Sequence, residues 1–181
     1  TWAQGVAQAW LILELTDSGS YLGLVTALQF APVLFFSISG GKIADKFNKR
    51  KVLMFTNLTS GLSALSVGTL VLTENIQIWH VMFFAFTLGL GNAIDAPVRQ
   101  SFNAEVVGKD DLPNAVGLNS ANFNTGRLLG PGLSGLLIAA YGTGVSFVLN
   151  GISYLIVIIA LLNIREADLF REERKSTSTK V

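Results

Sequence analysis

GKIADKFNKRK, residues 41–51, is a short cationic segment that lies between two long apolar stretches. It holds five Lys or Arg side chains and one carboxylate, Asp45. Neither Leu22–Ser39 before it nor Val52–Leu72 after it carries a charged side chain. Each stretch is about as long as the ~20 apolar residues that cross a bilayer. The segment therefore indicates a membrane protein in which a tight cationic connection joins two spanning helices.

The composition of the whole chain points the same way. The mean hydropathy of the 181 residues is +0.51. Only 14% of them are charged, whereas soluble domains carry roughly 25% charged residues. A soluble helical bundle would show narrow apolar stripes rather than whole uncharged runs. The net charge of +1 indicates no nucleic-acid partner, and the absence of cysteine excludes disulfides.

We predict an all-α membrane protein with six transmembrane helices, because every backbone polar group inside a bilayer must be paired within the protein. Strands of a membrane barrel would be about half as long and would alternate in polarity. The first apolar stretch is short, so we expect it to be the latter part of a truncated helix. No signal peptide is visible before it. The six apolar segments are Trp2–Leu15, Leu22–Ser39, Val52–Leu72, Ile78–Ile94, Ala115–Tyr141 and Val145–Ile164.

The positions of the cations predict the sidedness of these helices. Twelve of the thirteen Lys and Arg residues fall in three places: the 40–51 loop, the 95–114 loop and the tail after residue 164. The other connections hold none. The positive-inside rule makes the cation-bearing side cytoplasmic. We therefore expect a multi-pass protein of the cytoplasmic membrane, with residues 1–164 as its transmembrane domain and 165–181 as a cytoplasmic tail or linker.

A faint internal repeat relates the two halves of the chain at an offset of 94 residues. The run GLVTA at 23–27 corresponds to GLNSA at 117–121, and the third apolar segment overlays the sixth. Helix two runs inward where helix five runs outward. This is the pattern of an inverted three-plus-three repeat.

The cationic segment resembles the hallmark of the major facilitator superfamily of transporters, Gly-x-x-x-Asp-Arg/Lys-x-Gly-Arg-Arg/Lys. The match runs through Gly41, Asp45, Lys46, Lys49 and Arg50. Asn48 stands in place of the last glycine. This substitution is mild, because Asn adopts left-handed backbone more readily than other non-glycine residues.

Further stretches extend the resemblance over essentially the whole chain. GRLLGPGLSG at 126–135 is similar to the fifth-helix motif of the antiporter branch, Gly-x-x-x-Gly-Pro-x-x-Gly-Gly, and departs from it only at Ser134. Residues 9–18 and 95–100 are similar to the branch that exports enterobactin and macrolides. The resemblance implies the N-terminal half of a twelve-helix transporter that works with a second six-helix half. It departs from proton-coupled drug antiporters in one respect, since Ile78–Ile94 lacks the arginine that they usually carry in helix four.

One group of candidate residues concerns conformational gating. Asp45 and Asp95 are expected at the same depth on helices two and four, where they would face Lys46, Lys49 and Arg50. The resemblance implies that such a charge network latches the outward-facing state. Gly41 would allow a neighbouring helix to approach closely, and Gly130 with Pro131 would give a local kink. The alternative for the cations is a plain cytoplasmic anchor.

The second group concerns substrate binding. Arg127 lies on the order of 20 Å along helix five from Pro113, well inside the hydrocarbon, where a charged side chain marks a pathway or a paired site. Asn124 shares its polar face. Gln4 and Gln8 are one turn apart on helix one. For the two glutamines the alternatives are that they line a central cavity or that they form interhelical hydrogen bonds. For Arg127 the alternatives are a substrate contact or a structural pairing with backbone carbonyls or with a carboxylate of the second half.

The sequence carries no enzyme signature. It has no cysteine, one His and no phosphate-binding Gly-x-x-x-x-Gly-Lys-Ser/Thr loop, so we expect neither catalysis nor a cofactor. The function expected is alternating-access transport of a small molecule, with export favoured. Nutrient uptake by the same fold, or a membrane scaffold that does not transport, are the alternatives.

Overall fold

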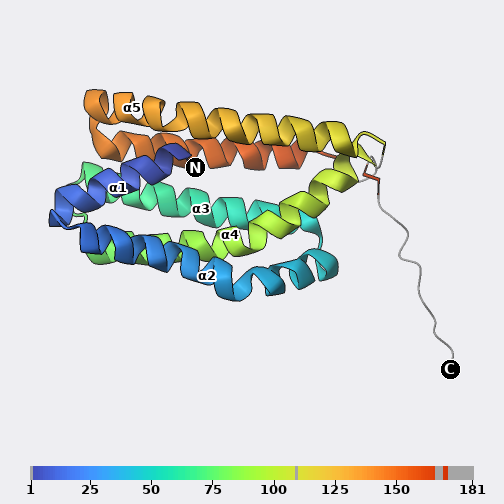
Figure 1. Cartoon of the computed structure of the whole chain (residues 1–181), viewed down its shortest axis with the longest axis horizontal. Coiled ribbons are helices and arrows are strands. Elements are labelled where there is room, and N and C mark those ends of the chain that lie inside the picture. Colours follow the sequence, from blue (N-terminus) through green and yellow to red (C-terminus); the bar gives the residue numbers. More distant parts are fainter. Residues whose placement is uncertain (1, 109, 166–168, 171–181) are drawn as a thin grey trace.

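The computed structural model describes residues 2–108, 110–165 and 169–170, except the side chains of residues 38, 39, 44 and 45. Within these ranges every regular element is an α-helix, which confirms the prediction of an all-helical protein. The helices lie side by side as an elongated bundle (Figure 1). Their bounds are α1 Trp2–Thr16, α2 Gly19–Lys46, α3 Lys49–Leu72, α4 Ile78–Val107 and α5 Leu112–Asn163.

The predicted 40–51 and 95–114 loops are mostly helical, and this part of the prediction is wrong. Helix α2 continues to Lys46, and α3 begins at Lys49 with the Asn48 side chain accepting the Lys51 N–H at 3.2 Å. Helix α4 continues to Val107, and Gly108 ends it with a φ of 75°. An apolar segment indicates the part of a helix that lies in the bilayer. Backbone hydrogen bonding can extend the helix beyond that part, and the helix ends where a capping residue satisfies its terminal groups.

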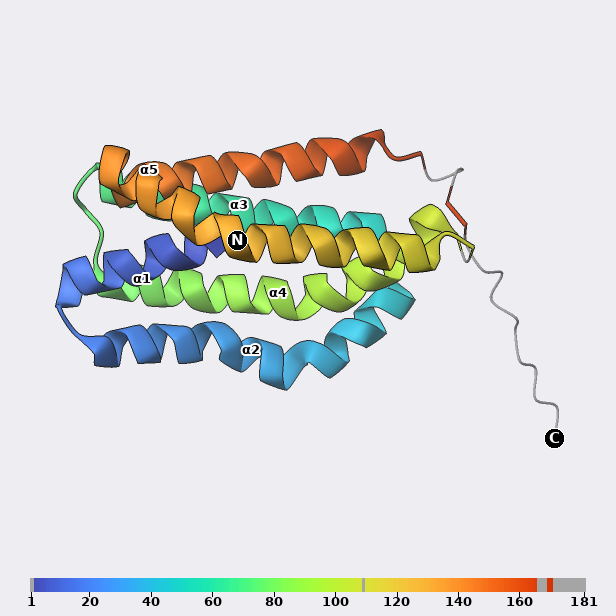
Figure 2. The same ribbon diagram turned by 45° about the horizontal axis from the view of Figure 1, so that its top comes forward.

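Helix α5 is too long for one membrane crossing. Its 52 residues would extend about 78 Å, against a hydrocarbon core of about 30 Å. Gly142, with φ 79° and ψ 172°, breaks the helical backbone, and the chain reverses there (Figure 2). Few other residues adopt this φ, because a Cβ would crowd the backbone. Helix α5 therefore consists of two antiparallel limbs, 112–141 and 143–163.

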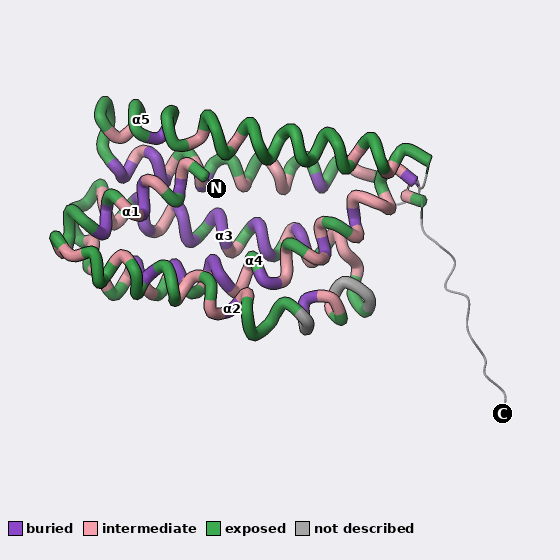
Figure 3. The backbone as a smooth tube through the Cα atoms, in the orientation of Figure 1, coloured by how far each residue is buried: buried purple, intermediate pink, exposed green. Residues whose placement is uncertain are grey.

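Among the described residues, four helices are long and apolar enough to cross a membrane. This number treats α5 as one helix. Large apolar side chains point outward along them, including Leu34 at 77% and Leu128 at 78% exposure. The first limb of α5 is exposed over most of its length (Figure 3). An apolar exterior of this kind suits lipid or another protein surface rather than water.

The interior has two apolar clusters and also contains buried polar side chains. The cluster around Ile12, Val25 and Phe147 joins α1, α2 and α5, and the cluster around Leu53, Val98 and Leu161 joins α3, α4 and α5. Buried polar residues include Gln4, Gln8, Thr56, Asn57, Ser60 and Ser63. Because buried polar groups need hydrogen-bond partners, these residues indicate a candidate site in the interior.

Candidate functional site

Asp95 is the centre of a cluster of polar side chains from α3 and α4. It lies on α4, beyond the apolar part of that helix. Its carboxylate accepts hydrogen bonds from Thr56 Oγ1 at 2.8 Å and Asn57 Nδ2 at 3.3 Å, both on α3. It also accepts from Arg99 Nε at 2.8 Å and Arg99 Nη2 at 3.0 Å, one turn later on α4. The negative charge is therefore neutralised locally and joins α3 to α4.

A polar cavity of about 410 Å³ opens beside this cluster, between α3, α4 and both limbs of α5. Asparagine amides and hydroxyl groups dominate its wall, which suits a ligand or water held by hydrogen bonds. Asn150 also donates to Gln4 Oε1 at 2.6 Å and so links the cavity to α1. The lining residues are Thr56, Asn57, Ser60, Asn92, Asp95, Arg99, Asn122, Asn150, Ser153, Tyr154 and Val157.

The two glutamines of α1 form interhelical hydrogen bonds, which is one of the two alternatives that the sequence allows. Gln4 accepts from Asn150 as described, and Gln8 Nε2 donates to Gln29 Oε1 on α2 at 3.0 Å. Both glutamines are more than nine-tenths buried. They also line a void of about 10 Å³, which is room for about one water molecule. In this conformation the glutamines hold helices together and face no large cavity.

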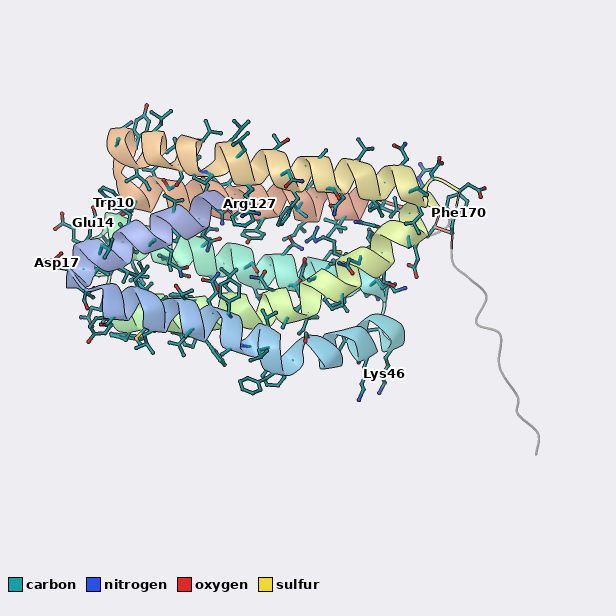
Figure 4. The ribbon with its side chains drawn as sticks, in the orientation of Figure 1. Trp10, Glu14, Asp17, Lys46, Arg127 and Phe170 are labelled. Carbon is teal, nitrogen blue, oxygen red and sulfur yellow. The ribbon has the colours of Figure 1, made fainter. Side chains whose placement is uncertain are left out.

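Arg127 projects from the first limb of α5 toward the N-terminal end of α1 (Figure 4). Its guanidinium carbon lies 5.9 Å from the centre of the Trp2 ring, within the range of a cation–π contact. Trp2 also meets Phe123 edge to face at 5.4 Å. Asn124 is exposed, and its amide donates to Ser120 O in the preceding turn. Neither Arg127 nor Asn124 lines the polar cavity.

The fifth-helix motif packs against α1. A Cβ placed on Gly130 would lie 2.9 Å from the Cβ of Trp2, so the missing side chain lets the two helices approach. Ser134 is fully buried, and its hydroxyl donates to Ala3 O at 2.9 Å. Pro131 lies within the helix on its exposed side. The residue that departs from the motif thus makes a direct contact between helices.

The cationic segment contacts the ends of α4 and α5. Lys49 Nζ pairs with Glu105 on α4 at 2.5 Å. Arg50 Nε and Nη2 donate to the carbonyl oxygens of Leu161 and Leu162 at 2.7 and 2.8 Å, at the end of α5. Lys46 lies 5.8 Å from the Phe47 ring centre. Among the described contacts, none of these three cations reaches Asp95.

A Cβ on Gly41, where the sequence predicts a close approach of a neighbouring helix, would meet nothing within 4 Å. The close approach occurs one residue earlier, where a Cβ on Gly40 would lie 2.5 Å from the Ala93 carbonyl oxygen. The predicted pairing of Asp45 lies outside the described residues.

Sequence reasoning missed Glu105 and most of the cavity wall. One signal was available, because Thr56, Asn57 and Ser60 are polar side chains at helical spacing in an uncharged segment. Asn150, Ser153 and Tyr154 repeat this pattern in the second limb of α5. Polar residues in a spanning helix need a partner or water, and these two groups face each other across the cavity.

Comparison with known proteins gives relatives among membrane transporters. The chain is 29% identical over 163 residues to the staphyloferrin A transporter of Staphylococcus aureus, covering 89% of this chain and 41% of the relative. It is 31% identical over 142 residues to the multidrug efflux pump Tap of Mycolicibacterium fortuitum, covering 76% and 35%. It is 22% identical over 162 residues to the enterobactin exporter EntS of Shigella flexneri, covering 90% and 40%.

The chain thus spans about two-fifths of the length of these relatives. No solved structure matches it significantly. The profile of the family described as transmembrane secretion effector matches residues 1–176, nearly the whole chain. Together with the helical bundle and its apolar exterior, this match shows that the chain belongs to the transmembrane secretion effector family of the major facilitator superfamily.

Proposed function

We propose that this chain is the N-terminal half of a secondary transporter that exports a small molecule by alternating access. The observation that carries the proposal is the polar cavity of about 410 Å³ inside a bundle whose exterior is apolar. Polar groups at the depth of a membrane are costly unless they serve a path or a site. The relatives carry siderophores or drugs according to their names, so we propose a compound of that kind as substrate.

We further propose that residues 1–164 form six spanning helices as an inverted three-plus-three repeat, with the two limbs of α5 as separate spans. Equivalent contacts support this. Gly40 on α2 packs closely against Pro97 on α4, and Ser134 on α5 bonds Ala3 on α1. At an offset of 94 residues, Gly40 corresponds to Ser134 and Ala3 corresponds to Pro97. Two contacts related by one offset are expected when two structural repeats pack alike.

The cation-bearing end of the bundle is proposed to be cytoplasmic. The α2–α3 connection, the α4–α5 connection and the end of α5 gather at one end of the bundle (Figure 1). Here Lys49 joins α3 to Glu105 on α4, and Arg50 joins α3 to the end of α5. We propose that this network, together with Asp45 and the separate cluster around Asp95, holds one conformation and opens in the other.

Arg127 is proposed as a substrate contact near the boundary with the second half of the transporter. Its exposed position and its contact with Trp2 leave the planar guanidinium accessible to an anionic or polar ligand. Arg127→Lys should reduce substrate affinity about tenfold or more, because lysine lacks the planar fork. Binding is measured on folded protein. If stability falls first and affinity falls only with the folded fraction, Arg127 is a structural residue.

The test of transport uses the full-length transporter in cells that lack their own drug and siderophore exporters. Export of a preloaded compound is followed for a panel of both classes. Asn122→Ala, in the cavity wall, should slow export several-fold. Asn119→Ala is the matched control, since Asn119 is exposed on the same helix and does not line the cavity. Accumulation instead of export would indicate uptake. The absence of any flux across the panel, with folded protein in the membrane, would refute transport of these compounds.

A further inference from the structure

A second, largely apolar groove lies at the cation-bearing end of the bundle, and Thr56 is the residue that it shares with the polar cavity. Its volume is about 450 Å³, and its wall comes from the end of α2, the start of α3 and Ile94 of α4. The α3 side is a stripe at helical spacing, formed by Lys51, Val52 and Phe55. Phe47 and Phe55 are 56% and 66% exposed, so two large apolar rings stand uncovered along it. These rings offer an apolar surface to an occupant of the groove.

Cationic side chains border the same groove. Lys51 lines it, and Lys46 stands over the ring of Phe47, which is also part of the wall. Figure 4 shows Lys46 at the end of α2 with its side chain directed away from the bundle. Lys46 and Lys51 are exposed, and no carboxylate pairs with either among the described residues. The N-terminus of α3, which starts at Lys49, adds the positive end of a helix dipole.

The boundary between the charged and the uncharged residues of α3 lies inside the groove. Charge ends at Lys51, and the uncharged stretch of α3 begins at the next residue, Val52. A lipid has the same arrangement, since a charged headgroup stands at the bilayer surface and an acyl chain extends from it into the hydrocarbon. Juxtamembrane lysines attract anionic headgroups with about 1 kcal/mol each.

We propose that this groove binds one anionic phospholipid, with an acyl chain along Phe47, Val52 and Phe55 and the phosphate at Lys51. The lysines select a net negative headgroup over a zwitterionic one. The apolar wall makes the site specific for an intact lipid rather than a free phosphate.

The proposal is tested by counting bound lipids on the purified protein with intact-complex mass spectrometry. The detergent-solubilised protein is titrated with phosphatidylglycerol or phosphatidylcholine of the same chains, and with glycerol phosphate. One tightly bound phosphatidylglycerol is expected, with at least tenfold weaker phosphatidylcholine binding. Lys51→Gln should weaken phosphatidylglycerol about fivefold. Lys42→Gln is the matched control. Lys42 is exposed near the end of α2, at the same end of the bundle as Lys51, but it does not line the groove.

The acyl part is tested separately. Phe55→Ala on α3 should weaken phosphatidylglycerol binding several-fold. Phe30→Ala on α2 removes a similarly exposed ring outside the groove and should not weaken it. Equal binding of the two lipids, or equal effects of the two lysine variants, would overturn the proposal in favour of nonspecific attraction. Binding of glycerol phosphate as tight as that of the lipid would make the site a phosphate site. No bound lipid on the full-length transporter would also overturn the proposal.

Discussion

The Asp95 cluster gives a quantitative prediction about what holds α3 against α4. A hydrogen bond to a charged group contributes about 1.5–3 kcal/mol to stability, and an exposed ion pair about 0–1 kcal/mol. The Arg99 side chain is 41% exposed, whereas Thr56 and Asn57 are buried. We therefore expect the Thr56 hydroxyl and the Asn57 amide to contribute about 3 kcal/mol together. Arg99 should contribute about 1 kcal/mol at most.

Double-mutant cycles separate these contributions. The free energy of unfolding is measured in detergent by tryptophan fluorescence for Asp95→Ala, Thr56→Val, Arg99→Met and the pairwise combinations. Coupling between Asp95 and Thr56 should reach about 1.5 kcal/mol and exceed that between Asp95 and Arg99. Thr59→Val is the matched control, for which we expect coupling near zero. Among the described residues its hydroxyl bonds the Thr56 carbonyl oxygen and does not reach Asp95.

The opposite ranking would refute the reasoning. A coupling of about 2 kcal/mol for Arg99, with almost none for Thr56, would mean that the ion pair behaves as buried despite its exposure. The polar cavity would then exclude water, and the estimate of screening at Asp95 would be wrong.

The remaining predictions concern packing, the α5 reversal and sidedness. Gly89→Ala should lower stability by about 1–3 kcal/mol, because its Cβ would overlap the Gln29 carbonyl oxygen, whereas Gly117→Ala meets nothing within 4 Å and should stabilise slightly. Thermal unfolding in one detergent compares them, and equal midpoints would contradict the packing. Gly142→Ala should cost about 1–2 kcal/mol, since its φ is 79°, and an unchanged unfolding temperature would count against the reversal. A cysteine at Asn48, in this cysteine-free chain, should resist impermeant thiol reagents in intact cells, and labelling from outside would reverse the proposed topology.

The sequence by itself determined the helical class and the approximate positions of the helices. Uncharged runs such as Val52–Leu72 are a local property, because the free energy of transfer into a bilayer sums over neighbouring residues. The clustering of cations in three places is equally local. The helix ends were predicted less well, since a cap such as Gly108 depends on backbone geometry rather than on hydropathy.

Only the tertiary structure decided which polar side chains meet. Asp95 and the cationic segment were both visible in the sequence, yet Asp95 binds Thr56 and Arg99, and Lys49 binds Glu105. Gln4 bonds Asn150, which lies 146 residues later. Such partners depend on how each helix is rotated about its axis against its neighbours, and the packing of all side chains at once fixes that rotation. A single helix therefore reveals that a polar residue needs a partner, while the assembled bundle selects the partner.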